Sequence, residues 1–146
     1  MQKISVAILT NGLLDPSVIP GGVGSGNLGV LYTAWSFSGA FSPRIGTIPF
    51  LSPSVTITPT SLTATLGVKP SAATSGSSSV VFQLSVNDVG FATVTVPFGS
   101  KYAELTTFSP TTIAPYSVLT ADVISIPTGS TIPVADATIQ LWFKAA

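Results

Sequence analysis

Apolar and polar side chains alternate with a period of two along much of the chain. Because successive side chains of a β-strand point to opposite faces, this period predicts strands with one buried face and one outer face. The apolar positions are Val55 and Ile57; Leu62, Ala64 and Leu66; Phe82, Leu84 and Val86; Ala92, Val94 and Val96; Leu119, Ala121 and Val123; and Ile139, Leu141 and Phe143.

Residues typical of tight turns lie between these runs. Asn87-Asp88-Val89-Gly90 predicts a hairpin, and residues 97–100 and 127–130 predict two further turns. The 12 prolines and 13 glycines interrupt the chain too often for regular helices. Short strands joined by such turns predict an all-β fold, an antiparallel β-sandwich of jelly-roll-like form.

The first 45 residues differ from the rest and predict an extended, glycine-rich N-terminal segment. A short strand is followed by the glycine-rich stretch 20–27 and then by four aromatic residues, Tyr32, Trp35, Phe37 and Phe41. We therefore divide the chain into residues 1–45 and a β-sandwich module, residues 46–146. The first part is either a loop between two strands of the same sandwich or an arm that orders on a neighbouring subunit, with its aromatic side chains as anchors.

Charged residues are scarce, at 7% of the chain against about 25% in an average soluble domain. Five basic and five acidic residues cancel, so there is no basic stripe to bind nucleic acid or an anionic membrane. No apolar stretch approaches the roughly 20 residues of a transmembrane helix. A surface with so little net charge opposes association weakly, which favours a protein that binds neighbouring proteins.

Candidate catalytic chemistry is sparse. The chain has no histidine and no cysteine, which excludes Ser-His-Asp and Cys-His catalysis, and no metal site or cofactor is expected. Asp122 and Asp136 are the best pair for a glycosidase that needs two carboxylates. A solvated strand residue and a turn-capping carboxylate explain these two positions without catalysis, so we expect no enzyme.

Trp142 lies on the outward phase of the last predicted strand. Beside Tyr102 or Tyr116 it could stack on a sugar ring or be buried between subunits, and burial between subunits is favoured. The candidate interface residues are therefore Tyr32, Trp35, Phe37, Phe41 and Trp142.

From residue 46 onward the chain resembles a β-sandwich module of bacteriophage structural proteins, found in head decoration (cement) proteins and in tail-fibre or appendage proteins. The similar stretches are residues 46–50 (Gly-Thr-Ile-Pro-Phe), 69–73 (Lys-Pro-Ser-Ala-Ala), 81–87 (Val-Phe-Gln-Leu-Ser-Val-Asn), 119–123 (Leu-Thr-Ala-Asp-Val) and 129–139 (Gly-Ser-Thr-Ile-Pro-Val-Ala-Asp-Ala-Thr-Ile). The chain departs from the module's pattern at two turns, where residues 116–118 replace a Gly-Asp turn and Val134 replaces a glycine.

This resemblance implies a virion structural protein. The leading expectation is a capsid decoration protein, a homotrimer on the particle surface that binds between major capsid subunits and stabilises the shell after assembly in the host cytoplasm. The alternative is a tail-fibre or receptor-binding protein that recognises a host-surface glycan. The same module is used for both tasks, and a fold by itself does not choose between them.

Overall fold

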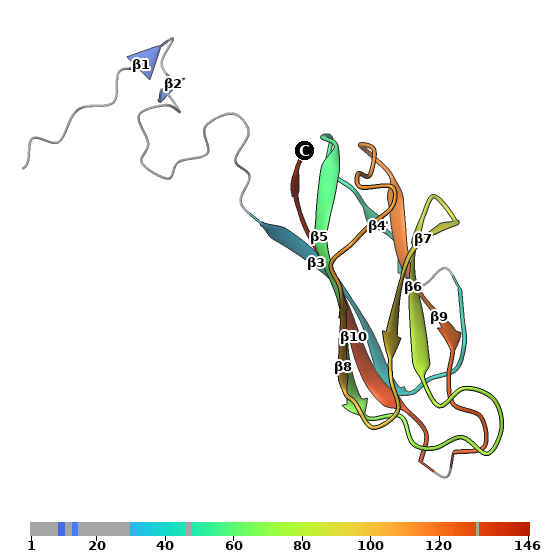
Figure 1. Ribbon diagram of the computed structural model, residues 1–146. Helices are drawn as coiled ribbons and strands as arrows, with labels where there is room; N and C mark the ends of the chain where they lie inside the picture. Colours follow the sequence, from blue (N-terminus) through green and yellow to red (C-terminus); the bar gives the residue numbers. More distant parts are fainter. Residues whose placement is uncertain (1–8, 11–12, 15–29, 46–47, 131) are drawn as a thin grey trace, which may run out of the picture.

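The computed structural model describes residues 9–10, 13–14, 30–45, 48–130 and 132–146, and these residues form strands and loops without a helix (Figure 1). Two four-stranded antiparallel sheets pack face to face, which confirms the predicted antiparallel β-sandwich. No helix in these ranges is long and apolar enough to cross a bilayer.

The sheets are named here by their strand order. Sheet I runs β3 (Leu31–Ala40), β10 (Ala135–Ala145), β5 (Ile57–Val68) and β8 (Tyr102–Leu105). Sheet II runs β4 (Phe50–Leu51), β9 (Val118–Ser125), β6 (Val80–Val86) and β7 (Val89–Val96). Two further short strands, β1 (Leu9–Thr10) and β2 (Leu13–Leu14), pair antiparallel with each other.

The pairing of the eight sandwich strands is nested. The first strand, β3, pairs with the last, β10; β4 pairs with β9, β5 with β8, and β6 with β7. The chain therefore runs as one long antiparallel ribbon that is folded over, with its halves crossing repeatedly between the two sheets. Arg44, which precedes β4 in the sequence, also pairs with β9 through an isolated antiparallel bridge to Val123.

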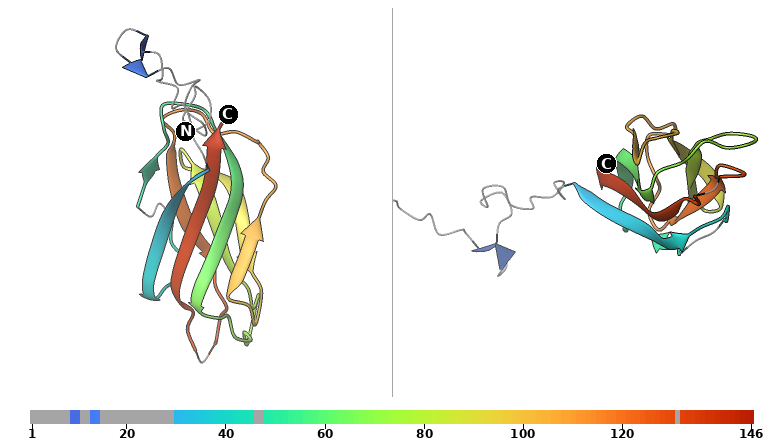
Figure 2. Two further views of the ribbon diagram at one scale, coloured as in Figure 1. Left: turned by 90° about the vertical axis from the view of Figure 1, so that its left-hand side faces the viewer. Right: turned by 90° about the horizontal axis from the view of Figure 1, so that it is seen from below.

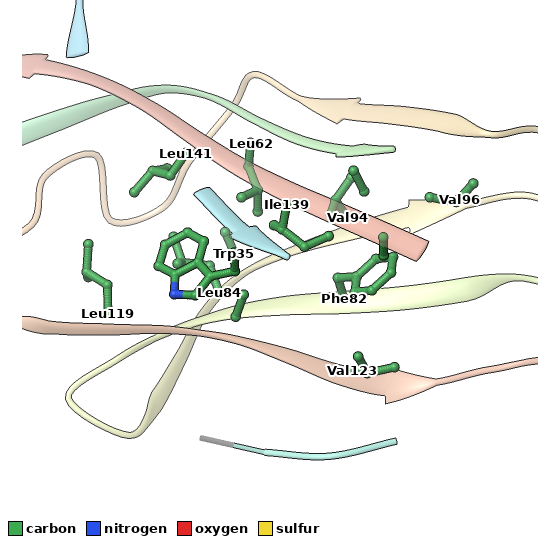
Figure 3. Close-up of a cluster of buried hydrophobic side chains, with 14 of the residues drawn as sticks. Trp35, Leu62, Phe82, Leu84, Val94, Val96, Leu119, Val123, Ile139 and Leu141 are labelled. Carbon is green, nitrogen blue, oxygen red and sulfur yellow. The ribbon is translucent and has the colours of Figure 1, made fainter. Parts of the chain in front are cut away.

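The core between the sheets is built from the alternating apolar positions (Figure 3). Leu62 on β5, Phe82 on β6 and Leu141 on β10 have no exposed surface, and the other predicted inward positions on these strands are buried or half-buried. Val55 is exposed because it precedes β5 and stands outside the sandwich. The period of two thus located the buried faces of β5, β6, β7, β9 and β10, but not that of β3, whose buried Trp35 and Phe37 were expected at an interface.

The β6–β7 hairpin has the predicted tight turn. Val86 and Val89 close the ladder, and both turn residues have a positive φ, 50° at Asn87 and 65° at Asp88. Asparagine and aspartate tolerate this conformation best among residues with a side chain. The Asn87 side chain also accepts a hydrogen bond from the Val118 amide at 2.8 Å, which ties the hairpin to β9.

The region preceding residue 45 contributes directly to the sandwich. β3 pairs with β10 along its length, and Trp35 and Phe37 are only 5% and 3% exposed. Residues 31–40 are therefore an ordinary strand of sheet I, and a division at residue 45 separates two strands of one fold. The glycine-rich stretch 20–27, predicted to be extended, lies outside the described residues.

Candidate binding surfaces on the β-sandwich

The five aromatic residues predicted at an interface separate into two groups. Trp35 and Phe37 pack in the protein's own core, which removes them from contact with a neighbouring subunit. Phe41 is half-buried and packs beside Phe37, with ring centroids 5.9 Å apart. Tyr32 and Trp142 instead lie together on the outer face of sheet I. Only this second group is placed to meet another molecule.

Trp35 and Phe37 also contact the segment that leads from β3 in sheet I to β4 in sheet II. The Trp35 indole Nε1 donates a 2.8 Å hydrogen bond to the Ile48 carbonyl, so its one polar atom is satisfied although the ring is buried. The Arg44 guanidinium lies 4.5 Å from the centroid of the Phe37 ring, within cation–π range. These contacts attach Arg44 and Ile48 to β3.

Tyr32 and Trp142 form a cross-strand aromatic pair. They are opposite each other in the β3–β10 register, and their ring centroids are 4.8 Å apart with an interplanar angle of 31°. Tyr32 is 58% exposed and Trp142 is half-buried. Figure 2 (left) shows the sheet that carries them, with β3, β10, β5 and β8 side by side. The outward phase predicted for Trp142 is correct, and the ring that packs against it within the protein is that of Tyr32.

A hollow of about 410 Å³ lies beside this pair on the outer face of sheet I. We call it the trough. Its described lining comes from the N-terminal side of β3 and from β5, β8 and β10: Val30, Thr60, Ser61, Thr63, Tyr102, Glu104, Gln140 and Trp142. Among them, only Tyr102 and Trp142 were considered as binding residues from the sequence, although alternation along β5 and β10 marks Thr63 and Gln140 as outward-facing.

Glu104 organises the polar side of the trough. Its Oε1 accepts a 2.6 Å hydrogen bond from the Ser61 hydroxyl, and its Oε2 accepts a 3.1 Å hydrogen bond from the Tyr102 hydroxyl. The pKa of Tyr102 is raised by desolvation, then by its hydrogen bond to Glu104 and by the charge of Glu104. The phenol is protonated at neutral pH even at its ordinary pKa of 10.0, and the hydrogen bond to Glu104 extends this to higher pH.

The outer face of sheet II is different. Asp122 is only 1% exposed, and its Oδ2 accepts a 2.5 Å hydrogen bond from the Ser85 hydroxyl on the adjacent strand. The sequence-based interpretation of Asp122 as a solvated strand residue is therefore wrong. The bond joins β9 to β6, the strand that pairs with it in sheet II.

Asp136 occupies a separate place in the fold. It lies on β10 in sheet I with a φ of 53°, and its Oδ1 accepts a 2.7 Å hydrogen bond from the Gly39 amide. This bond joins β10 to β3 beside the irregularity in their register, between residues 97 apart in the sequence, and is not the local turn cap expected from the sequence. Asp122 and Asp136 belong to different sheets, so the fold does not present them as a pair on one strand face.

Exposed apolar side chains lie at several points along the side of sheet II that ends in β4, on the residues before β4, on β4 and on β9. Ile45 and Ile48, which precede β4, are 84% and 77% exposed. Leu51 on β4 and Val118 on β9 are paired neighbours, and Ile124 lies toward the other end of β9. We call these five residues the apolar edge. Ile45 and Ile124 also line a shallow hollow beside Val123.

Neither a metal cluster nor a known relative identifies the protein. Within the ranges that the structure describes, no group of three or more histidine, cysteine, aspartate or glutamate side chains could hold a metal ion. Comparisons with protein-family models, with curated proteins and with solved structures found no match.

Proposed function

We propose that the chain is a non-enzymatic virion structural protein, a capsid decoration protein with a jelly-roll sandwich that binds between major capsid subunits. The nested pairing β3–β10, β4–β9, β5–β8 and β6–β7 supports the jelly roll, an architecture common in viral capsid domains. The resemblance of residues 46–146 to a bacteriophage module supports the virion role. The scarcity of charge fits a surface that is covered in an assembly.

The apolar edge is the observation that carries this proposal. Single exposed apolar residues are normal on a monomer, but a group of them along one sheet edge indicates an interaction surface. Burying an isoleucine side chain contributes about 1.5–3 kcal/mol, so Ile45 and Ile48 together offer a substantial part of a contact. β4 is also the last strand of sheet II among the described residues, and this edge is where we expect copies of the chain to meet in the homotrimer.

The mechanism of a decoration protein is mechanical. Each copy binds two or more neighbouring subunits, and a homotrimer of this chain links several of them at once. Because linked contacts act as intramolecular ones after the first is made, many modest contacts stabilise a shell far more than one contact does. The protein then resides on the particle surface and joins it during assembly in the host cytoplasm.

The oligomeric state of the purified chain tests the role of the apolar edge. We expect size-exclusion chromatography with light scattering to give a trimer at micromolar concentration, and Ile45→Asp with Ile48→Asp to give a monomer. Val89→Asp is the matched control, because Val89 is an exposed apolar residue at the β6–β7 hairpin. A monomeric wild-type chain, or an unchanged trimer in the double variant, would argue against assembly through this edge.

Electron microscopy of particles that carry the protein tests its position. Density between major capsid subunits on the head supports a decoration protein. Density on the tail instead supports the second candidate, a tail-fibre or receptor-binding protein that recognises a host-surface glycan. The exposed pair of Tyr32 and Trp142 is the specific observation that favours this second candidate.

A further inference from the structure

We propose that the trough on sheet I is a binding site for a neutral saccharide, with Trp142 as the stacking platform and Glu104 as the central hydrogen-bond acceptor. A sugar ring has apolar C–H faces and a rim of hydroxyl groups. A site for it therefore needs an aromatic surface next to converging polar groups, and the trough has both.

The aromatic surface is held in place by the protein itself. Trp142 on β10 has Tyr32 on its β3 side, at 4.8 Å between ring centroids, while the trough lies on its β5 side. Tyr32 therefore supports one side of the indole and leaves another part of it lining the trough. The electron-rich face of an aromatic ring attracts the positively polarised C–H groups of a sugar.

Tyr102 marks the opposite end of the trough. In the register, Trp142 lies beside Ser61 and Tyr102 lies beside Thr65, four residues further along β5 and one strand beyond it. Strand spacing and rise then place the Cα atoms of Trp142 and Tyr102 about 16 Å apart. The Tyr102 hydroxyl points back to Glu104, so the two aromatic rings lie closer together than these Cα atoms, and a short saccharide can contact both.

Glu104 is oriented before any ligand arrives. Ser61 and Tyr102 each donate to a different oxygen of its carboxylate, at 2.6 and 3.1 Å, which fixes the plane of the group. A carboxylate has about four acceptor positions, so each oxygen can still accept a bond from a sugar hydroxyl. Bonds to a charged acceptor are stronger than those between neutral groups.

The remaining lining residues favour a neutral sugar. Gln140 offers both donors and an acceptor, and Thr63 lies buried between it and Glu104 in the register. Among the described residues of the trough, Glu104 is the only charged one. An acidic sugar would bring a second negative charge close to this carboxylate without a cation in the lining to balance it.

The size of the trough agrees with a small ligand. A hollow of about 410 Å³ lies in the lower part of the usual range for small-molecule sites, roughly 300–1,000 Å³. The biological role of this saccharide site rests on the second candidate function, a receptor-binding protein that recognises a host-surface glycan. It does not use the apolar edge, so saccharide binding and subunit assembly can fail separately.

An array of immobilised oligosaccharides tests the site, with glucose-, galactose-, mannose- and N-acetylglucosamine-based neutral glycans and sialylated counterparts as probes. We expect the wild-type chain to bind one neutral class and not the sialylated ones. Trp142→Ala should weaken that binding by about tenfold or more, since stacking and burial of an aromatic ring together contribute over 1 kcal/mol. Glu104→Gln should weaken it as well, because the charged acceptor is lost.

Two control variants separate the site from general effects. Phe98→Ala removes an exposed aromatic ring from the β7–β8 loop, and Asp88→Asn removes a carboxylate at the β6–β7 turn, where asparagine also tolerates a positive φ. Both should bind as the wild type does. Light scattering of Trp142→Ala completes the design, and its oligomeric state should be that of the wild type.

Three results would overturn the proposal. The first is no binding by the wild-type chain to any neutral glycan on the array, and the second is binding that Trp142→Ala and Glu104→Gln leave unchanged. The third is a change in oligomeric state on Trp142→Ala, which would make this face of sheet I an interface between copies. If the Ile45→Asp, Ile48→Asp protein loses the trimer but still binds glycans, the saccharide proposal stands, because the trough does not depend on the apolar edge.

Discussion

Each outer face of the sandwich carries a carboxylate that is hydrogen-bonded to a serine, but the two carboxylates differ in their exposure to solvent. On sheet II, Asp122 is buried and bonded to Ser85 within the protein. On sheet I, Glu104 is exposed and also bonded to a serine, yet it stands beside an open trough between aromatic residues. The carboxylate of Asp122 is buried within the protein, whereas that of Glu104 is accessible to a ligand.

The difference teaches that an outward-facing polar residue on a strand has no fixed role. A buried carboxylate that accepts a hydrogen bond contributes to stability, and its removal leaves a buried donor without its partner. An exposed carboxylate in a hydrogen-bonded network contributes little to stability but is preorganised for binding. The two faces should therefore respond to mutation in different measurable quantities.

The largest effect on stability is expected at Asp122. Asp122→Ala removes the acceptor of the Ser85 hydroxyl in a buried position, and we expect the free energy of unfolding to fall by about 2–3 kcal/mol. Gln140→Ala on the outer face of sheet I should change it by no more than about 0.5 kcal/mol. Urea unfolding followed by circular dichroism measures both. If the two substitutions lower the free energy of unfolding equally, the outer faces do not differ in their contribution to stability.

A smaller effect is expected from the aromatic pair on sheet I. Tyr32→Ala, Trp142→Ala and the double variant form a thermodynamic cycle, and we expect a coupling of about 0.5–1 kcal/mol from the tilted ring pair. Urea unfolding of the four proteins gives this coupling. A coupling of zero would mean that Tyr32 does not support the indole, and the geometry of the trough would lose its basis.

The smallest effect is expected in the titration of Tyr102. Its pKa is raised above the ordinary value of 10.0, so the folded state keeps the proton where the unfolded state has begun to lose it. The associated stability is present below pH 10.0 and is lost as the pH rises through the folded-state pKa. Glu104→Gln removes the charge of Glu104 and should lower the Tyr102 pKa toward 10.0, while the contribution of desolvation remains.

Absorbance of tyrosinate at 295 nm, recorded as a function of pH, measures this titration. The chain has three tyrosines, and Tyr102→Phe identifies the contribution of Tyr102 by difference. If the titration midpoint of Tyr102 is unchanged in the Glu104→Gln protein, the Tyr102 hydroxyl is not hydrogen-bonded to the Glu104 carboxylate.

The sequence by itself determined the local features of the protein. Alternation with a period of two predicted the buried side of most long strands, as at Leu62, Phe82 and Leu141, because that period follows from backbone geometry alone. It was not used for β3, whose buried Trp35 and Phe37 were expected at an interface. Asn87 and Asp88 predicted the hairpin because few residues tolerate a positive φ at two successive positions. Trp142 was correctly placed on an outer face for the same local reason.

Tertiary structure alone decided what each outward residue meets. Ser85 and Asp122 are 37 residues apart, Ser61 and Glu104 are 43 apart, and both pairs are brought together by strands that are distant in the sequence. A period of two states that a side chain faces outward, but not which strand lies beside it. For that reason Asp122 looked solvated and proved to be buried, while the trough around Glu104 and Trp142 became visible only when β3, β10, β5 and β8 were placed in one sheet.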